Sequence, residues 1–174
     1  MPAHADGGPL TVKIAPSIVH LLYIAALEAP DRPALTFAGE TISYAQYAGL
    51  VAGLAKHLRD EGAAGGRVAV VLANSLDAAV ALFAAQAAGA QVVPLNPFYT
   101  PRELQQIFAD AEPCIALFHR GAAPAIETFA PTCKLIDMAD ALDPAWSERG
   151  AAALANFLPR ADELAMLQYT GGTT

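Results

Sequence analysis

The sequence predicts an α/β fold built on a doubly wound, mainly parallel sheet with flanking helices. Three short apolar runs carry this prediction, at residues 67–72, 91–95 and 114–118. Such runs are typical of strands that are buried on both faces of a parallel sheet. Helical patterns separate them, and strands that alternate with helices indicate βαβ units with right-handed crossovers. Because crossover helices cover both faces, we expect a sheet enclosed between two helical layers.

The N-terminal part predicts a helix and a hairpin. Residues 1–16 are rich in Gly and Pro and read as a loose lead-in. Ser17 then opens an apolar stretch that ends before Pro30, which is typical of a helix. Residues 33–37 and 40–43 are two β-rich runs around an Ala-Gly turn, so we expect a short hairpin there.

Three further helices are predicted by the residues at which they start. Ser43 and Gln46 form a capping-box pattern, and so do Thr100 and Glu103, which enclose a Pro at the first helical position. Ser75 is placed to cap a helix between them, with apolar residues on one stripe behind it. Gly62 is placed to end the helix that starts after Ser43, and Gly89 the helix that starts after Ser75.

The C-terminal part is patterned more weakly until its last strand. Residues 124–129 predict a small helix and residues 134–136 a strand. Residues 140–162 read as a connecting segment with at most a short helix, anchored by Trp146. Residues 164–169 are apolar and predict a final strand that runs directly into the last five residues.

Composition excludes several classes of function. The net charge is −7, and the ten Lys and Arg residues form no cluster, which argues against a nucleic-acid partner. The longest uncharged stretch, residues 78–101, is mostly Ala and is broken by prolines, so no membrane span is expected. With no signal peptide either, the expected location is cytoplasmic.

Cysteine, histidine and charge usage add three expectations. Cys114 and Cys133 lie far apart and read as two buried thiols of an intracellular protein. The four histidines stand singly, so no metal site is expected from them. Charged residues make up 16% of the chain, against roughly 25% in an average soluble domain. This shortage suggests that more protein covers part of the surface.

The candidate functional residues are the last five. They are Thr170, Gly171, Gly172, Thr173 and Thr174. Glycines let a backbone approach a bulky anion, successive N–H groups can line an anion-binding nest, and threonine hydroxyls can donate to phosphate oxygens. Ligands of parallel sheets bind beyond the carboxyl ends of the strands, where this loop would lie. A polar turn that leaves a strand explains the same residues about equally well, and no Walker-type pattern is present.

A resemblance decides between these two interpretations. Residues 162–174 read Asp-Glu-Leu-Ala-Met-Leu-Gln-Tyr-Thr-Gly-Gly-Thr-Thr and resemble the start of the phosphate-loop signature of the AMP-forming adenylating enzymes, Tyr-Thr-Ser-Gly-Thr-Thr-Gly-x-Pro-Lys-Gly. Residues 41–47 and 87–97 are similar to two earlier segments of the same superfamily, in the same order. Gly171 and residues 98–104 resemble its fatty-acyl-CoA ligase branch.

The resemblance implies an activity and its cofactors. The superfamily adenylates a carboxylic acid with ATP and Mg²⁺, releases pyrophosphate, and passes the acyl group to the thiol of CoA. It implies that residues 170–174 bind the β- and γ-phosphates, with a weaker assignment of Thr174 to the magnesium ion. Fatty or aryl acids are the substrates expected for this branch.

The same resemblance indicates what this chain lacks. Its loop lysine, adenine-binding segment, Mg²⁺-binding Glu, ribose-binding Asp and C-terminal lid have no counterpart in the 174 residues. We therefore expect residues 17–174 to form an incomplete N-terminal α/β domain that ends inside the phosphate loop, inactive by itself, with no catalytic side chain. The alternative is a free-standing, non-catalytic α/β binding or signalling module. Oligomeric state is left open.

Overall fold

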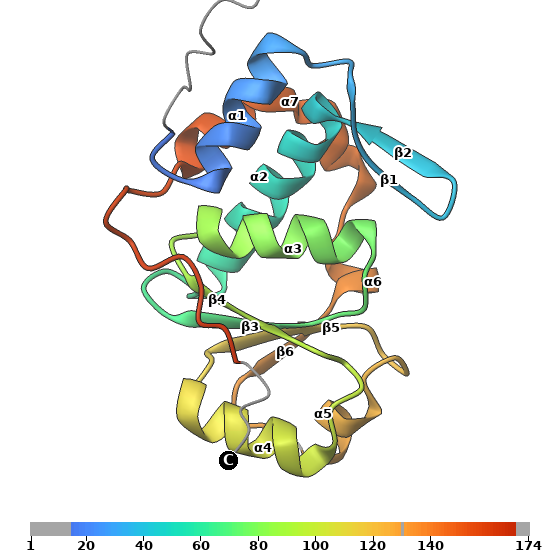
Figure 1. Cartoon of the computed structure of the whole chain (residues 1–174), viewed down its shortest axis with the longest axis vertical. Coiled ribbons are helices and arrows are strands. Elements are labelled where there is room, and N and C mark those ends of the chain that lie inside the picture. The colour runs from blue at the N-terminus through green and yellow to red at the C-terminus, as the bar shows by residue number, and fades with distance from the viewer. Residues whose placement is uncertain (1–14, 130, 170–174) are drawn as a thin grey trace, which may run out of the picture.

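A four-stranded parallel sheet lies at the centre of the computed structural model, which describes residues 15–129 and 131–169 (Figure 1). Its strand order is β4–β3–β5–β6, and all three neighbouring pairs are parallel. The strands are β3 (Arg67–Val71), β4 (Gln91–Leu95), β5 (Ile115–Phe118) and β6 (Lys134–Asp137). The predicted hairpin is also present as an antiparallel pair, β1 (Pro33–Phe37) and β2 (Glu40–Ser43).

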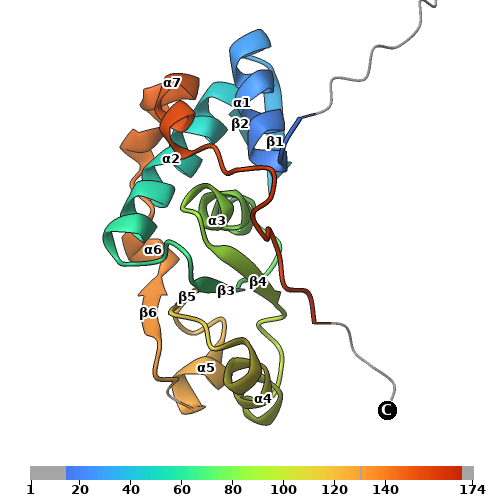
Figure 2. The same cartoon turned by 90° about the vertical axis from the view of Figure 1, so that its left-hand side faces the viewer.

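Helices cover both faces of the sheet, which confirms the predicted fold class (Figures 1 and 2). On one face lie α1 (Ile18–Glu28), α2 (Tyr44–Asp60) and α3 (Leu76–Ala87). On the other lie α4 (Pro101–Ala111) and α5 (Pro124–Phe129). The sheet is therefore the middle layer of three.

The apolar run of strand β3 is not interrupted by polar residues, because both faces of the strand are buried. Val68 and Val70 belong to the core on the α2 side, while Ala69 and Val71 belong to the core on the α4 side. Successive side chains of a strand point to opposite faces, so a strand covered twice must be apolar at every position. Fully burying a valine side chain contributes roughly 1.5–3 kcal/mol.

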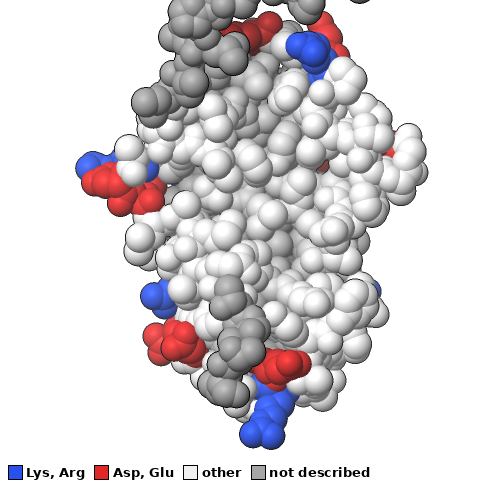
Figure 3. Space-filling view, in the orientation of Figure 1, with Lys and Arg blue, Asp and Glu red and all other residues white. Residues whose placement is uncertain are grey.

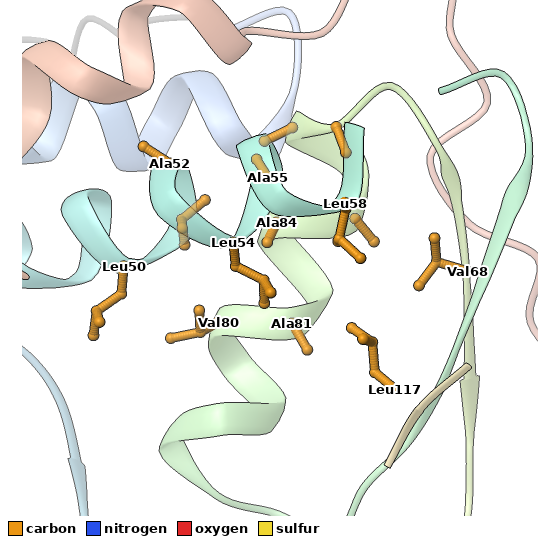
Figure 4. Close-up of a cluster of buried hydrophobic side chains, with 14 of the residues drawn as sticks. Leu50, Ala52, Leu54, Ala55, Leu58, Val68, Val80, Ala81, Ala84 and Leu117 are labelled. Carbon is orange, nitrogen blue, oxygen red and sulfur yellow. The ribbon is translucent and has the colours of Figure 1, made fainter. Parts of the chain in front are cut away.

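The larger of the two cores lies between α2, α3 and the sheet. Leu54 and Leu58 of α2 extend toward Ala81 and Ala84 of α3 (Figure 4), and all four are fully buried. Small side chains on α3 let the two helices approach closely, so the leucines fill the space that the alanines leave.

Each of the predicted N-caps is present. Ser17, Ser43, Ser75 and Thr100 all accept a hydrogen bond from the backbone N–H three residues later. In the two capping boxes, Gln46 Oε1 accepts from the N–H of Ser43 at 2.8 Å, and Glu103 Oε2 accepts from the N–H of Thr100 at 2.8 Å. Local sequence therefore set these helix starts.

We expect the two capping boxes to respond differently to acid. Hydrogen bonds from the Thr100 backbone N–H and hydroxyl hold the pKa of Glu103 below its usual 4.5. A carboxyl group whose pKa is lowered by folding stabilises the fold above its unfolded pKa and loses that contribution as the pH falls through its folded pKa. We expect Thr100→Ala to cost about 1 kcal/mol near neutral pH and less in acid. Urea unfolding across acidic and neutral pH measures this.

Ser43→Ala is the matched control for that prediction. The partner of Ser43 is Gln46, which does not titrate. The stability that Ser43→Ala removes should therefore stay constant over the same pH range. A pH dependence shared by both variants would show that the Glu103 carboxylate is not responsible.

The expectation of a connecting segment with at most a short helix over residues 140–162 was wrong. Four short helices follow β6: α6 (Met138–Ala141), η1 (Pro144–Arg149), α7 (Gly150–Leu154) and η2 (Ala155–Phe157). The last three, η1, α7 and η2, pack along α2, whereas α6 packs against β6, and Leu154 is fully buried in the larger core. Segments this short show little helical periodicity, so only their tertiary contacts identify them.

Trp146 of η1 anchors this segment, as predicted. Its indole ring rests against the backbone of Gly53, and its carbonyl group lies against Gly49, one turn earlier on α2. A Cβ atom at either position would overlap Trp146. The two glycines lie four residues apart, on one face of the helix, and leave the space that Trp146 occupies.

One expectation about cysteine was also wrong. Cys114 is exposed and Cys133 is partly exposed, so the two are not buried thiols. Both lie one residue before the first residue of a strand, at the amino end of the sheet.

Candidate functional site

Residues 164–169 lie along the outer edge of β4 and lead to the loop predicted to bind phosphate (Figure 2). The N–H of Val92 donates to the carbonyl of Ala165 at 3.0 Å, and the N–H of Leu167 donates to the carbonyl of Val92 at 2.9 Å. These two bonds make one parallel bridge between Val92 and Met166. The predicted strand is therefore reduced to a single bridge.

Pro94 explains why the pairing stops there. In a strand, residues two apart turn their N–H and C=O groups to the same side, so Pro94 faces the same edge as Val92. The next bond of the ladder would need an N–H from Pro94, and proline has none. Proline in a sheet is confined to such outward-facing edge positions.

Tyr169 fixes the point at which the chain enters the loop. Its hydroxyl donates a hydrogen bond to the carboxylate of Asp110 on α4, and its ring packs against the smaller core. Burial raises the pKa of Tyr169 to about 12, and the bond to Asp110 adds to this effect. Residues 170–174 lie outside the described residues, so their role in phosphate binding stays a prediction.

The loop after β4 shares the carboxyl edge of the sheet. Asn96 accepts a hydrogen bond from the N–H of Phe98 at 2.9 Å through its side-chain oxygen, which stabilises the turn after β4. The turn leaves the Phe98 side chain 81% exposed. An exposed aromatic ring therefore lies just beyond the carboxyl end of β4, the strand that carries Pro94.

The strand order identifies a second candidate ligand-binding position at this edge, between β3 and β5. The chain passes from β3 to β4 on one side and returns past β3 to reach β5, so β3 and β5 flank the topological switch point. Open α/β sheets commonly bind ligands in the crevice at such a point. Here His119, just after β5, contacts Asp77 at the start of α3, with 3.0 Å between Nε2 and Oδ2.

Asp137 flanks the same histidine from β6. Its Oδ1 lies 3.8 Å from His119 Nδ1 and accepts from the N–H of Ala139 at 3.1 Å, while Oδ2 accepts from the N–H of Arg120 at 3.3 Å. The side chain of Asp137 is only 8% exposed. The chain's own side chains thus occupy the switch point, where two backbone N–H groups hold the Asp137 carboxylate.

Sequence reasoning missed this cluster. Its members come from three separate elements and are distant in sequence. The available signal was positional, because His119 directly follows a strand, Asp137 ends one, and Asp77 opens a helix. Carboxyl ends of parallel strands meet at one edge, so such residues can be expected to converge.

Charge is sparse on the face that carries β4 and α3. Figure 3 shows this face as largely uncharged, with Lys, Arg, Asp and Glu gathered toward its rim. Three apolar side chains are strongly exposed near β4: Phe98 at 81%, Leu164 at 76% and Met166 at 44%. Single exposed apolar residues are ordinary, but several together near one sheet edge mark an interaction surface.

The described part of the chain has neither a metal-binding cluster nor a helix that could span a membrane. Within residues 15–129 and 131–169, no group of three or more His, Cys, Asp or Glu side chains is placed to hold a metal ion. No helix in the same ranges has both the length and the apolar character needed to cross a membrane.

Together these features define the class of the protein. It is a doubly wound α/β protein whose strand ends and loops meet at one carboxyl edge, the arrangement in which such sheets bind ligands. A sequence model of the AMP-binding enzyme family matches residues 22–174. The chain belongs to this family of adenylate-forming enzymes.

Relatives in the family catalyse different overall reactions. The chain is 30% identical over 200 residues to a long-chain-fatty-acid–CoA ligase of Haemophilus influenzae, covering 91% of this chain and 35% of that one. It is 34% identical over 150 residues to a putative 4-coumarate–CoA ligase-like protein of rice, covering 82% and 24%. Syringomycin synthase SyrB1 of Pseudomonas syringae is 39% identical over 88 residues, covering 50% and 14%.

Solved structures share the fold. VinN superposes with a TM-score of 0.74 at 26% identity, covering 88% of this chain and 42% of that one. A fatty acyl-adenylate ligase of Legionella pneumophila, solved with acyl adenylate and pyrophosphate, also gives 0.74, at 24% identity, covering 92% and 29%. The chain thus spans about a third or less of the curated relatives described above.

Proposed function

We propose that residues 17–174 are part of the N-terminal domain of an AMP-forming acyl-CoA ligase, and that residues 170–174 bind the β- and γ-phosphates of ATP. One observation carries this proposal. The segment over residues 164–169 runs parallel to β4, and Tyr169 is held by Asp110. Residue 170 therefore follows a segment that points in the strand direction, toward the edge where parallel sheets bind ligands.

The residue types of the loop fit a nucleotide triphosphate. Gly171 and Gly172 have no Cβ, so backbone N–H groups there can approach phosphate oxygens closely. The hydroxyls of Thr170, Thr173 and Thr174 add donors, and a hydroxyl oxygen such as that of Thr174 is a ligand type that Mg²⁺ accepts. Binding of this kind positions the phosphates and stabilises their charge, which is most of what phosphate chemistry demands.

The proposed reaction has two steps. A carboxylate oxygen of the acid attacks the α-phosphorus of ATP, and pyrophosphate leaves to give an acyl adenylate. The thiol of CoA then attacks the acyl carbon, and AMP leaves. A loop that holds the β- and γ-phosphates acts in the first step, where it binds the leaving pyrophosphate.

We propose a fatty or an aryl acid as the substrate. The similarity to the fatty-acid–CoA ligase of Haemophilus and the coumarate–CoA ligase-like protein of rice supports these two acid classes and the CoA step. Gly171 and the segment after β4 resemble the fatty-acyl branch. We further propose a cytoplasmic location and no nucleic-acid partner, in keeping with the net charge of −7.

Pyrophosphate exchange into ATP, driven by added carboxylic acids, tests the proposal on the protein that contains this chain. We expect exchange with fatty or aryl acids and a loss of about 100-fold or more in Thr174→Val, since one lost donor to developing charge costs that much in other enzymes. Thr36→Val, on the exposed hairpin strand β1, is the matched control and should keep full exchange.

Two outcomes would contradict the proposal. Equal exchange rates in Thr174→Val and Thr36→Val would remove the loop from phosphate binding. No exchange with any carboxylic acid would favour the non-catalytic module instead. For the 174-residue chain alone, calorimetric titration with Mg-ATP should give no measurable heat.

A further inference from the structure

Cys114 and Cys133 are neighbours across the parallel pair β5–β6. The register pairs Ile115 with Lys134, and the N–H of Lys134 donates to the carbonyl of Cys114 at 3.0 Å. Continuing the same register back by one residue places Cys114 opposite Cys133. Neighbouring strands lie about 4.7–4.9 Å apart, which is within the Cα separation of about 4.4–6.8 Å that disulfides span.

Both side chains lie on the same face of the sheet. Within β5, Ala116 and Phe118 belong to the smaller core on the α4 side, so Cys114, two residues before Ala116, points to that face as well. Cys133 packs against the same core. Both cysteines line the same cavity beside α4.

A cavity gives small reagents access to the pair. Its volume is 540 Å³, and both cysteines line it together with Gln105, Phe108 and Glu112. Cys114 is exposed, and its thiol lies 3.2 Å from the carbonyl of Arg67. Cys133 is half-buried, so the two thiols differ in access while they share one opening.

We propose that Cys114 and Cys133 are a modification site, a dithiol that closes to a disulfide between β5 and β6 when a small disulfide oxidant is present. The thiolate of Cys114 attacks oxidised glutathione, its S–S bond breaks, and one glutathione thiol leaves. The thiolate of Cys133 then attacks the Cys114 sulfur and releases the second glutathione. Two protein thiols are oxidised and one glutathione disulfide is reduced.

The two steps differ in their dependence on pH. Burial raises the pKa of the Cys133 thiol to about 11, and the neighbouring Cys114 adds to this shift. Below that pH, each unit of pH increases the thiolate fraction about tenfold. The titratable groups that line the cavity with Cys133 are Cys114 and Glu112. Release of the second glutathione should therefore accelerate about tenfold per pH unit from neutral to mildly alkaline pH.

Incubation of the full chain with oxidised glutathione, followed by intact-mass and peptide mass spectrometry, tests the proposal. We expect an intramolecular cross-link between the peptides of Cys114 and Cys133, with a loss of two hydrogens and no retained glutathione. Cys133→Ser should stop at a stable glutathione adduct on Cys114. An adduct that persists in the unaltered chain, or cross-links between two chains, would overturn the proposal.

A comparison in guanidinium separates native geometry from simple proximity in the sequence. If the fold aligns the thiols, the equilibrium constant for closure should be at least about tenfold higher in the native chain than in the denatured one. Equal constants would show that the strands do not preorganise the pair, and the proposal would fail.

Discussion

Gly53→Ala should destabilise the protein, although alanine is the better helix former. The added Cβ would overlap the indole ring of Trp146, whose atoms rest directly on the Gly53 backbone. Overpacking of this kind typically costs about 1–3 kcal/mol, and an overlap with a ring rather than with the end of a flexible chain lies at the upper end. Alanine returns about 1 kcal/mol of helix propensity. We expect a net loss of about 2 kcal/mol in urea unfolding.

Trp146→Ala supplies the control for this prediction. Without the ring, the Gly53→Ala substitution meets no obstacle, and the gain in helix propensity should make it stabilising by up to about 1 kcal/mol. The sign of the effect therefore reverses between the two backgrounds. The same loss with and without Trp146 would show that the ring does not rest on Gly53.

Leu54→Ala should have the largest effect on stability. Leu54 is fully buried between α2 and α3, where it packs over the alanines of the facing helix (Figure 4). Removing buried methyl groups forfeits their transfer free energy and leaves a cavity, at a cost of about 2–5 kcal/mol. Against a total stability of about 5–15 kcal/mol, this is a large fraction. The midpoint of urea unfolding measures it.

Leu27→Ala is the matched control, since it removes the same atoms from a helix. Leu27 lies on α1 and is 56% exposed. Surface substitutions of this kind usually change stability by less than about 0.5 kcal/mol. If the two variants lost equal stability, the core between α2 and α3 would not be the main source of packing energy.

Much of the fold was predictable because its signals are local. Ser43 and Thr100 marked helix starts through contacts within one turn, and the apolar run of β3 required cover on both faces. The short helices after β6 were not predictable in this way. Trp146 holds η1 through glycines almost a hundred residues earlier on α2, a contact that no local pattern contains.

In the candidate site, too, local features were predictable and contacts between distant residues were not. The sequence predicted an apolar segment leading into the loop, but the extent of its pairing depended on Pro94, which lies on another strand. Tyr169 was placed by its bond to Asp110 of α4, and His119 by carboxylates from two other elements. Each of these contacts joins residues that the chain separates widely.

By itself, the sequence determined the order of strands and helices as far as β6, the helix N-caps, the doubly wound architecture and the resemblance to adenylate-forming enzymes. These depend on periodicity, capping and motif spacing, which act within one element or between consecutive ones. Only the tertiary structure decided that residues 164–169 form one bridge, that Trp146 rests on Gly53, and that Cys114 and Cys133 line one cavity. The reason is physical, because strand register and helix packing bring together residues that are distant in sequence.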